Sequence, residues 1–145
     1  MAMDYVTARV EAKEYYRTIG TVFSPAIGEQ IYFSNRGFRH ILFKQGLKGR
    51  AKDHQIRRFS LLPFAVELIG LATTHQEFEM KTEVHHVKNN VVRYWGIIAI
   101  LRNEKFKVVI RKINENGMVH FWSIIPDVQT SPRRDKKIFA AKIKN

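Results

Sequence analysis

The strongest structural signal in the sequence is a β-hairpin, formed by Phe106-Lys-Val-Val-Ile-Arg-Lys-Ile113 and Met118-Val-His-Phe-Trp-Ser-Ile-Ile125. Both runs are rich in β-branched and aromatic residues, and the polar link between them ends in Asn116-Gly117. Asn-Gly is typical of a type I′ turn, in which both central residues have positive φ. A two-residue turn there predicts the cross-strand pairs Ile113 with His120, Arg111 with Trp122, and Ile110 with Ser123.

Side chains alternate between the two faces of a strand, so this hairpin has one apolar face and one mixed face. The apolar face, which we expect in the core, carries Phe106, Val108, Ile110, Val119, Phe121 and Ile125. The other face carries Lys107, Arg111, His120 and Trp122, with Val109, Ile113 and Ile124 among them. Cations, an imidazole and a large ring on one face are suited to RNA.

The rest of the chain predicts helices before this hairpin and two further strands beside it. Residues 4–16 favour a helix, although apolar residues there also alternate as in a strand. A short strand is expected at 30–34. A helix at 37–45 has Asn35 as its cap and places His40 and Lys44 on a shared face away from its apolar stripe. A second helix at 53–69, capped by Asp53, contains Pro63, which should kink or split it near Leu62.

Strands are expected at 77–87 and 91–101, with a turn at Lys88-Asn89-Asn90 between them. The predicted fold is therefore α+β, with N-terminal helices packed on one face of an antiparallel β-meander of about four strands. We expect a single domain over 1–130. The segment 131–145 is a basic C-terminal tail, either disordered or ending in a short helix.

Charge is the strongest global signal. The chain of 145 residues has 25 Lys and Arg against 13 Asp and Glu, a formal net charge of +12. Such an excess attracts polyanions. Nucleic acid is favoured over a membrane because the cations are interleaved with aromatic residues instead of lining one amphipathic helix.

The sequence has no cysteine, which excludes disulfides and thiolate zinc sites within it. It has no basic region followed by an apolar run at its start and no apolar stretch of membrane-spanning length. We therefore expect no signal peptide and no membrane partner. The expected location is the cytoplasm, either of the producing cell or of a target cell after delivery.

A family resemblance covers roughly residues 30–126. The segment Gly37-Phe-Arg-His-Ile41, the following arginine-bearing apolar helix, and a late strand ending in His120-Phe-Trp-Ser-Ile-Ile-Pro126 resemble the barnase, EndoU, colicin and RelE group of ribonucleases. The likeness is to the phage and mobile-element members often called PBECR. It implies a metal-independent endoribonuclease without cofactors, acting as a toxin or effector, with a cognate inhibitor or immunity protein as a partner. The oligomeric state stays open.

Metal-independent RNA cleavage needs a base for the 2′-hydroxyl, an acid for the leaving 5′ oxygen, and cations for the phosphorane charge. His40 and His120 are the candidate acid and base, because histidine titrates near neutrality. Catalytic charge is assigned to Lys44 and Arg111. The candidate RNA-binding residues are Lys107, Arg57, Arg58, Trp122 and Tyr94, the two rings being able to stack bases.

The resemblance also implies a Ser or Thr on the last strand of the active site, a place that Ser123 matches. Strict alternation puts Ser123 on the core face. Either a bulge after Trp122 turns it outward, or it is a small buried packing residue.

Other chemistries are disfavoured by what the sequence lacks. The adjacent His85 and His86 point to opposite faces of a strand, so a shared metal site is not expected. No phosphate-binding Gly-Lys-Ser/Thr loop and no Gly-x-Ser-x-Gly elbow occurs. The alternative to a nuclease is a non-catalytic RNA- or DNA-binding module that uses the same basic face, or a structural partner in a larger assembly.

Overall fold

The structure is a computed structural model that describes residues 4–44, 48–85, 87–128 and 139–141. The helices in this part of the chain are α1 (Tyr5–Ile19), α2 (Asn35–Leu42) and α3 (Lys52–Leu71). The strands are β1 (Thr21–Ser24), β2 (Glu29–Tyr32), β3 (Glu77–His85), β4 (Lys88–Leu101), β5 (Glu104–Ile113), β6 (Val119–Pro126) and β7 (Phe139–Ala141). The predicted α+β class is confirmed.

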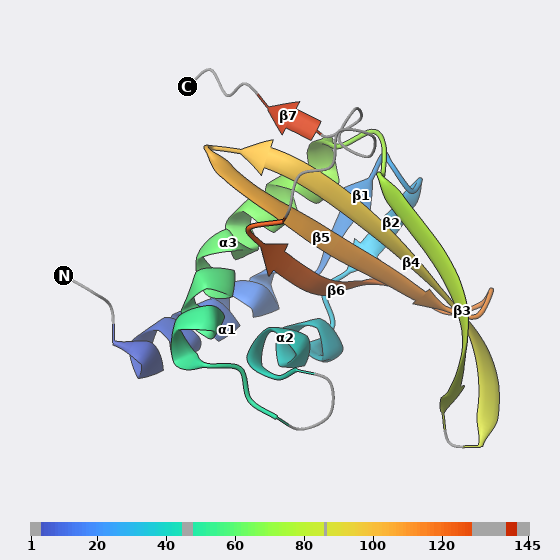
Figure 1. Ribbon diagram of the computed structural model, residues 1–145, viewed down its shortest axis with the longest axis horizontal. Helices are drawn as coiled ribbons and strands as arrows, with labels where there is room; N and C mark the ends of the chain where they lie inside the picture. Colours follow the sequence, from blue (N-terminus) through green and yellow to red (C-terminus); the bar gives the residue numbers. More distant parts are fainter. Residues whose placement is uncertain (1–3, 45–47, 86, 129–138, 142–145) are drawn as a thin grey trace.

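The sheet has the strand order β1-β2-β6-β5-β4-β3, and β7 pairs with β4. The four strands β3 to β6 form the antiparallel meander predicted from the sequence. The sheet is nevertheless larger than expected and mixed, because β2 pairs with β6 in parallel and β7 with β4 in parallel. Figure 1 shows α3 crossing behind β4 and β5, while the far end of the β3–β4 hairpin extends beyond the helices.

The core lies between the sheet and the helices. From β5 and β6, Phe106, Val108, Ile110, Phe121 and Ile124 are fully buried against it. The α3 side chains Leu61, Leu62, Ala65, Leu68 and Ile69 are buried on the other side. Pro63 does not split α3, so the break expected near Leu62 is absent. It lies on the exposed side of the helix, where water can reach the carbonyl that it leaves without an N–H partner.

The hairpin register differs from the prediction by two residues. Arg111 pairs with His120, not with Trp122, and Ile110 pairs with Phe121. The predicted Asn-Gly turn is wrong, because Asn114 and not Asn116 or Gly117 has positive φ. Gly117 is still required, since a Cβ there would lie 1.8 Å from the Ile113 carbonyl oxygen. A two-residue shift preserves the face of every side chain, so the predicted core face survives as far as Phe121.

A β-bulge then reverses the alternation. Ile110 pairs with Phe121 and the next residue, Val109, pairs with Ser123, so Trp122 is an extra residue on β6. As a result, Ile124 is buried in the core and Ile125 is 36% exposed, the opposite of the prediction.

Two further turns differ from expectation. Lys88, Asn89 and Asn90 belong to β4, and His85 pairs with Lys88 across the actual turn. Between β4 and β5, Arg102 and Asn103 both have positive φ, the signature of a type I′ turn that the sequence analysis did not identify.

Several boundaries also move. β1 was not predicted, α2 ends at Leu42 before Lys44, and the residue that caps α3 is Ala51, not Asp53. Phe139–Ala141 form a strand instead of a tail or helix. The tail cations at 133, 134, 136, 137, 142 and 144, and residue 45 of the predicted helix, lie outside the described residues. No helix in the described part of the chain is long and apolar enough to cross a membrane.

Candidate nucleic-acid cleft

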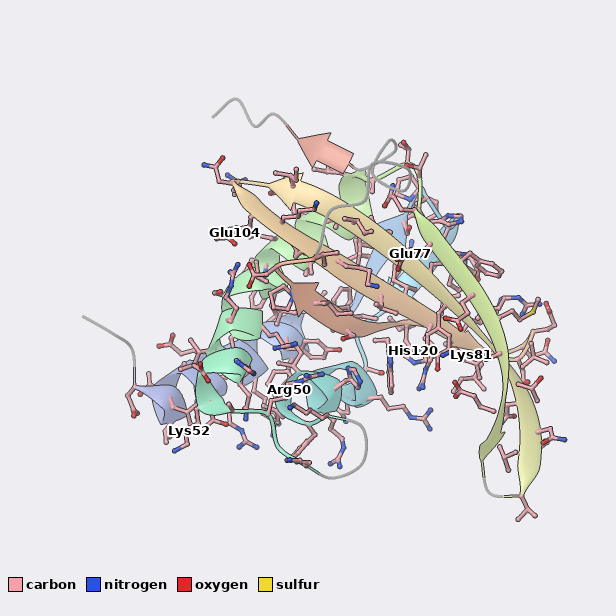
Figure 2. The ribbon with its side chains drawn as sticks, in the orientation of Figure 1. Arg50, Lys52, Glu77, Lys81, Glu104 and His120 are labelled. Carbon is pink, nitrogen blue, oxygen red and sulfur yellow. The ribbon has the colours of Figure 1, made fainter. Side chains whose placement is uncertain are left out.

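A cleft of about 1220 Å³ lies on the face of the sheet that α3 does not cover. Its walls come from α2, from the segment that follows α2, and from β3, β4, β5 and β6. The described cations that line it are Arg36, Arg39, Lys44, Lys48, Arg50, Lys81 and Arg111, and the one carboxylate among these described lining residues is Glu83. In Figure 2, His120 and Lys81 lie at the end of the sheet nearest α2, Arg50 lies beside α2 itself, and Glu104 lies at the opposite end of the sheet. We call this site the basic cleft.

A row of polar side chains crosses the cleft face of the sheet. Tyr94 of β4, Arg111 of β5 and His120 of β6 are direct cross-strand neighbours. Arg111 Nε donates a 3.1 Å hydrogen bond to His120 Nε2, and the Tyr94 hydroxyl donates to Glu83 Oε2 at 2.7 Å. Arg111 is only 5% exposed and His120 only 6%. These charged and polar groups are therefore held in place on this face of the sheet by one another, with Tyr94 and Arg111 lining the cleft.

Trp122 joins this row to α2. Its ring is stacked with His40, with centroids 4.5 Å apart, and the Arg111 guanidinium carbon lies 3.5 Å from its centroid. Its ring also meets His120 edge-on. Because protein groups already contact the ring, Trp122 is better suited to holding His40 and Arg111 than to stacking a base. Tyr94 lines the cleft with Lys81 over its ring.

Both histidines are neutral at neutral pH. Burial, with added repulsion from Arg50, Arg111 and Arg58, lowers the pKa of His40 from 6.5 to about 4. Burial also lowers the pKa of His120 to about 4, since the bond to the Met118 carbonyl only partly offsets it. An anion in the cleft would oppose these cations and raise both pKa values.

Ser123 lines the cleft, although it is only 4% exposed. The bulge at Trp122 turns it to this face, so the first of the two sequence alternatives is the observed one. Lys44 also lines the cleft, but from the loop after α2, where its backbone N–H donates to the Lys48 carbonyl.

Three predicted RNA-binding cations are not brought to the cleft. Arg57 pairs with Glu104 and Asp127, and Lys107 pairs with Glu77 at 2.8 Å. Arg58 donates to the backbone carbonyls of Ile124 and His54, which ties α3 to β6. These side chains link helices and strands within the fold and do not line the basic cleft, so they are not part of the candidate site.

The structure adds cleft residues that the sequence analysis missed, chiefly Arg36, Arg39, Arg50, Lys81 and Glu83. Arg36 and His40 are four residues apart on α2, so helical spacing was a usable signal for Arg36. Arg50 required tertiary information, since its Nε donates to the carbonyl of His40. Lys81 and Glu83 required knowledge of which strand is next to β4.

Among the residues that the structure describes, no three His, Asp or Glu side chains gather closely enough to hold a metal ion. Comparisons with protein-family models, with curated proteins and with solved structures found no match to this chain. The ribonuclease-family resemblance therefore stays a prediction.

Proposed function

We propose that the protein is a metal-independent endoribonuclease that cleaves RNA by attack of the 2′-hydroxyl on the adjacent phosphodiester. The observation that carries this proposal is the convergence of His40, Arg111, Trp122 and Ser123 in a cleft lined by cations. A cleft lined mostly by cations concentrates a polyanion, and its buried arginine suits the charge that develops on a phosphorane.

The proposed cleavage consists of two proton transfers, one bond formed and one bond broken. A base takes the 2′-hydroxyl proton, the O2′–P bond forms, the P–O5′ bond breaks, and an acid returns a proton to O5′. The products carry a 2′,3′-cyclic phosphate and a 5′-hydroxyl. His40 lines the cleft with a neutral imidazole, the form that can accept a proton, and is our candidate base. The family resemblance adds the proposal of a toxin-like effector acting on tRNA or mRNA, with a cognate inhibitor.

A second candidate, a non-catalytic RNA-binding module, is favoured by one specific observation. His120 accepts a hydrogen bond from Arg111, and both histidines have a pKa near 4. A site that only binds RNA needs no titrating group near neutrality, whereas the cations of the cleft suffice for affinity.

The test is incubation of the purified protein with tRNA and total RNA in excess EDTA, followed by analysis of the product ends. The nuclease proposal predicts discrete fragments with cyclic phosphates, and no cut where the nucleotide at the cleavage site is 2′-deoxy. His40→Ala should abolish the fragments. The matched control is His54→Ala, an exposed histidine of α3, which should leave them unchanged. Intact RNA that still shifts on a native gel would overturn the nuclease and support the binding module.

A further inference from the structure

Arg111 is an unusual arginine because it is buried in the sheet and yet lines a cleft. It is 5% exposed, and its guanidinium carbon lies over the Trp122 ring at 3.5 Å. Its Nε donates to His120 Nε2, and its cross-strand neighbour Tyr94 donates its hydroxyl to Glu83. The guanidinium is thus held on more than one side before any ligand arrives.

The partners of His120 determine which of its ring nitrogens carries the proton. Nδ1 lies 3.3 Å from the carbonyl oxygen of Met118, and a carbonyl can only accept, so Nδ1 bears the hydrogen. Arginine Nε can only donate, so Nε2 of His120 must offer its lone pair to Arg111. The ring is therefore a neutral imidazole with both nitrogens in use. It cannot take up a proton at Nε2 without breaking its bond to Arg111.

We infer that His120 is a positioning residue, which accepts the Nε–H of Arg111 and so directs the guanidinium's remaining donors at a phosphate in the basic cleft. This inference rests on the proposed function for its cleavage readouts. It replaces the acid or base role predicted for His120. An arginine fixed in advance needs little reorganisation when charge develops on the phosphate, which is how preorganised donors lower a barrier.

The position of the pair in the sheet supports this role. Arg111 and His120 are direct neighbours on β5 and β6, one step from the bulge that presents Trp122 and Ser123. His120 itself is not among the residues that line the cleft, whereas Arg111 is. A general acid or base must reach the substrate within hydrogen-bond distance. Arg111 is placed to touch the phosphate, and His120 acts through it.

The test compares two substitutions of His120 that differ in whether they can accept a hydrogen bond. In His120→Gln, the side-chain Oε1 can accept a hydrogen bond from the Nε–H of Arg111, but the side chain does not titrate. In His120→Leu, the side chain neither accepts a hydrogen bond nor titrates. Single-turnover cleavage of one RNA in EDTA would be measured from pH 5 to 8.5. We expect His120→Gln to stay within about tenfold of wild type with an unchanged pH profile, and His120→Leu to lose about 100-fold, as expected for a misdirected donor.

Arg111→Leu supplies the matched comparison. If His120 acts through Arg111, the double variant with His120→Leu should be no slower than Arg111→Leu alone. If His120→Gln is as inactive as His120→Leu and the pH profile loses a limb, His120 transfers a proton and the inference is overturned. Additive losses in the double variant would overturn it as well.

Two readouts keep the inference separate from the nuclease proposal. If wild type cleaves nothing, affinity for a short single-stranded RNA replaces the rate: Arg111→Leu and His120→Leu should weaken binding equally, and His120→Gln should not. Unequal losses of affinity would overturn the inference.

The second readout is nitrogen NMR of the His120 ring in the wild-type protein, which shows which ring nitrogen is protonated and does not depend on a variant that folds. A protonated Nδ1 with a bare Nε2 from pH 5.5 to 8 supports the inference, and a protonated Nε2 overturns it.

Discussion

The two faces of the sheet both contain buried side chains, but the kinds of side chain that they bury differ. The helix-covered face is filled by apolar side chains such as Phe106, Ile110 and Phe121, all at 0% exposure. The cleft face buries Arg111, His120 and Ser123 at 4 to 6% exposure, beneath Trp122 and α2. Polar groups buried this deeply must be held by hydrogen bonds, so they are costly for folding and precise in position. The first face therefore contributes most of the apolar burial that stabilises the fold, and the second face holds the polar groups of the candidate site.

The two tryptophans test that division most strongly, because one lies on each face. Trp122 packs against His40 and Arg111, whereas Trp95 packs against the core and against Phe78, with ring centroids 5.6 Å apart. Trp122→Leu should slow RNA cleavage by about 100-fold, because small misplacements of catalytic groups have effects of that size. Trp95→Leu should lower the melting temperature and leave cleavage by the folded protein near wild type. Equal rate losses in the two variants would remove the distinction between the faces.

The bulge makes a second comparison possible between adjacent isoleucines. Ile124 is fully buried in the core, and Ile125 lines the cleft at 36% exposure. Ile124→Ala should reduce the free energy of unfolding by about 2–5 kcal/mol, as for other large-to-small core changes. Ile125→Ala should cost less than about 1 kcal/mol, because a partly exposed side chain leaves no closed cavity. Urea denaturation of both variants measures the difference.

The reverse order of these two effects would mean that strict alternation continues through Ser123. In that case Ile125 would face the core, and Ser123 would be a packing residue with no access to the cleft. The isoleucine pair is therefore a test of the bulge itself, and it needs neither RNA nor an assay of activity.

The sequence predicted the faces well because they depend on local alternation. Each residue of β5 takes its face from its neighbours, and a register error of two residues leaves that face unchanged. The bulge could be offered only as one of two alternatives for Ser123, because the run Phe121 to Ile125 contains no glycine or other residue that marks a bulge. It depends on how β6 fits against β5, which is set by tertiary packing.

The roles of the cations were harder to predict than the strands, because a charged residue in the sequence does not show which carboxylate or ligand it will contact. Arg57 meets Glu104, 47 residues away, and Lys107 meets Glu77, 30 residues away. Helical spacing within α2 was a local signal for Arg36 beside His40, but no local pattern places Lys81 in the cleft. The sequence thus predicted the types of residue that line the cleft, but it identified only some of the individual residues.

The pH dependence of stability offers a third test of the cleft face. His40 and His120 have a folded pKa of about 4, below the unfolded value near 6.5, so the unfolded chain binds more protons between these limits. Stability should therefore be full above pH 6.5 and fall as the pH drops towards 4. The slope is at most about 1.4 kcal/mol per pH unit for a fully buried histidine, and less for the partly exposed His40.

Urea denaturation at several pH values between 4 and 7 measures this slope. The double variant His40→Gln, His120→Gln should have a flatter profile in this window, because two of its groups no longer titrate. An unchanged profile would show that the acid loss arises elsewhere and that the two imidazoles do not titrate differently in the folded and unfolded chains.

The smallest expected effect is on RNA affinity, and it distinguishes an arginine of the cleft from an arginine on the helix-covered side of the sheet. Arg39 is exposed at the cleft wall over the Phe43 ring, and Arg57 of α3 is paired with Glu104. Arg39→Ala should weaken RNA binding several-fold and reduce the slope of log affinity against log salt by about 0.7, the value for one phosphate contact on a single strand. Arg57→Ala should leave that slope unchanged and cost less than about 1 kcal/mol of stability, because its ion pair is partly exposed.

Arg9→Ala, at an exposed arginine of α1, removes the same charge without touching the cleft or an ion pair of the described residues. If all three variants reduce the slope equally, RNA binds to the net charge of the protein instead of the basic cleft, because only a localised site distinguishes arginines by position.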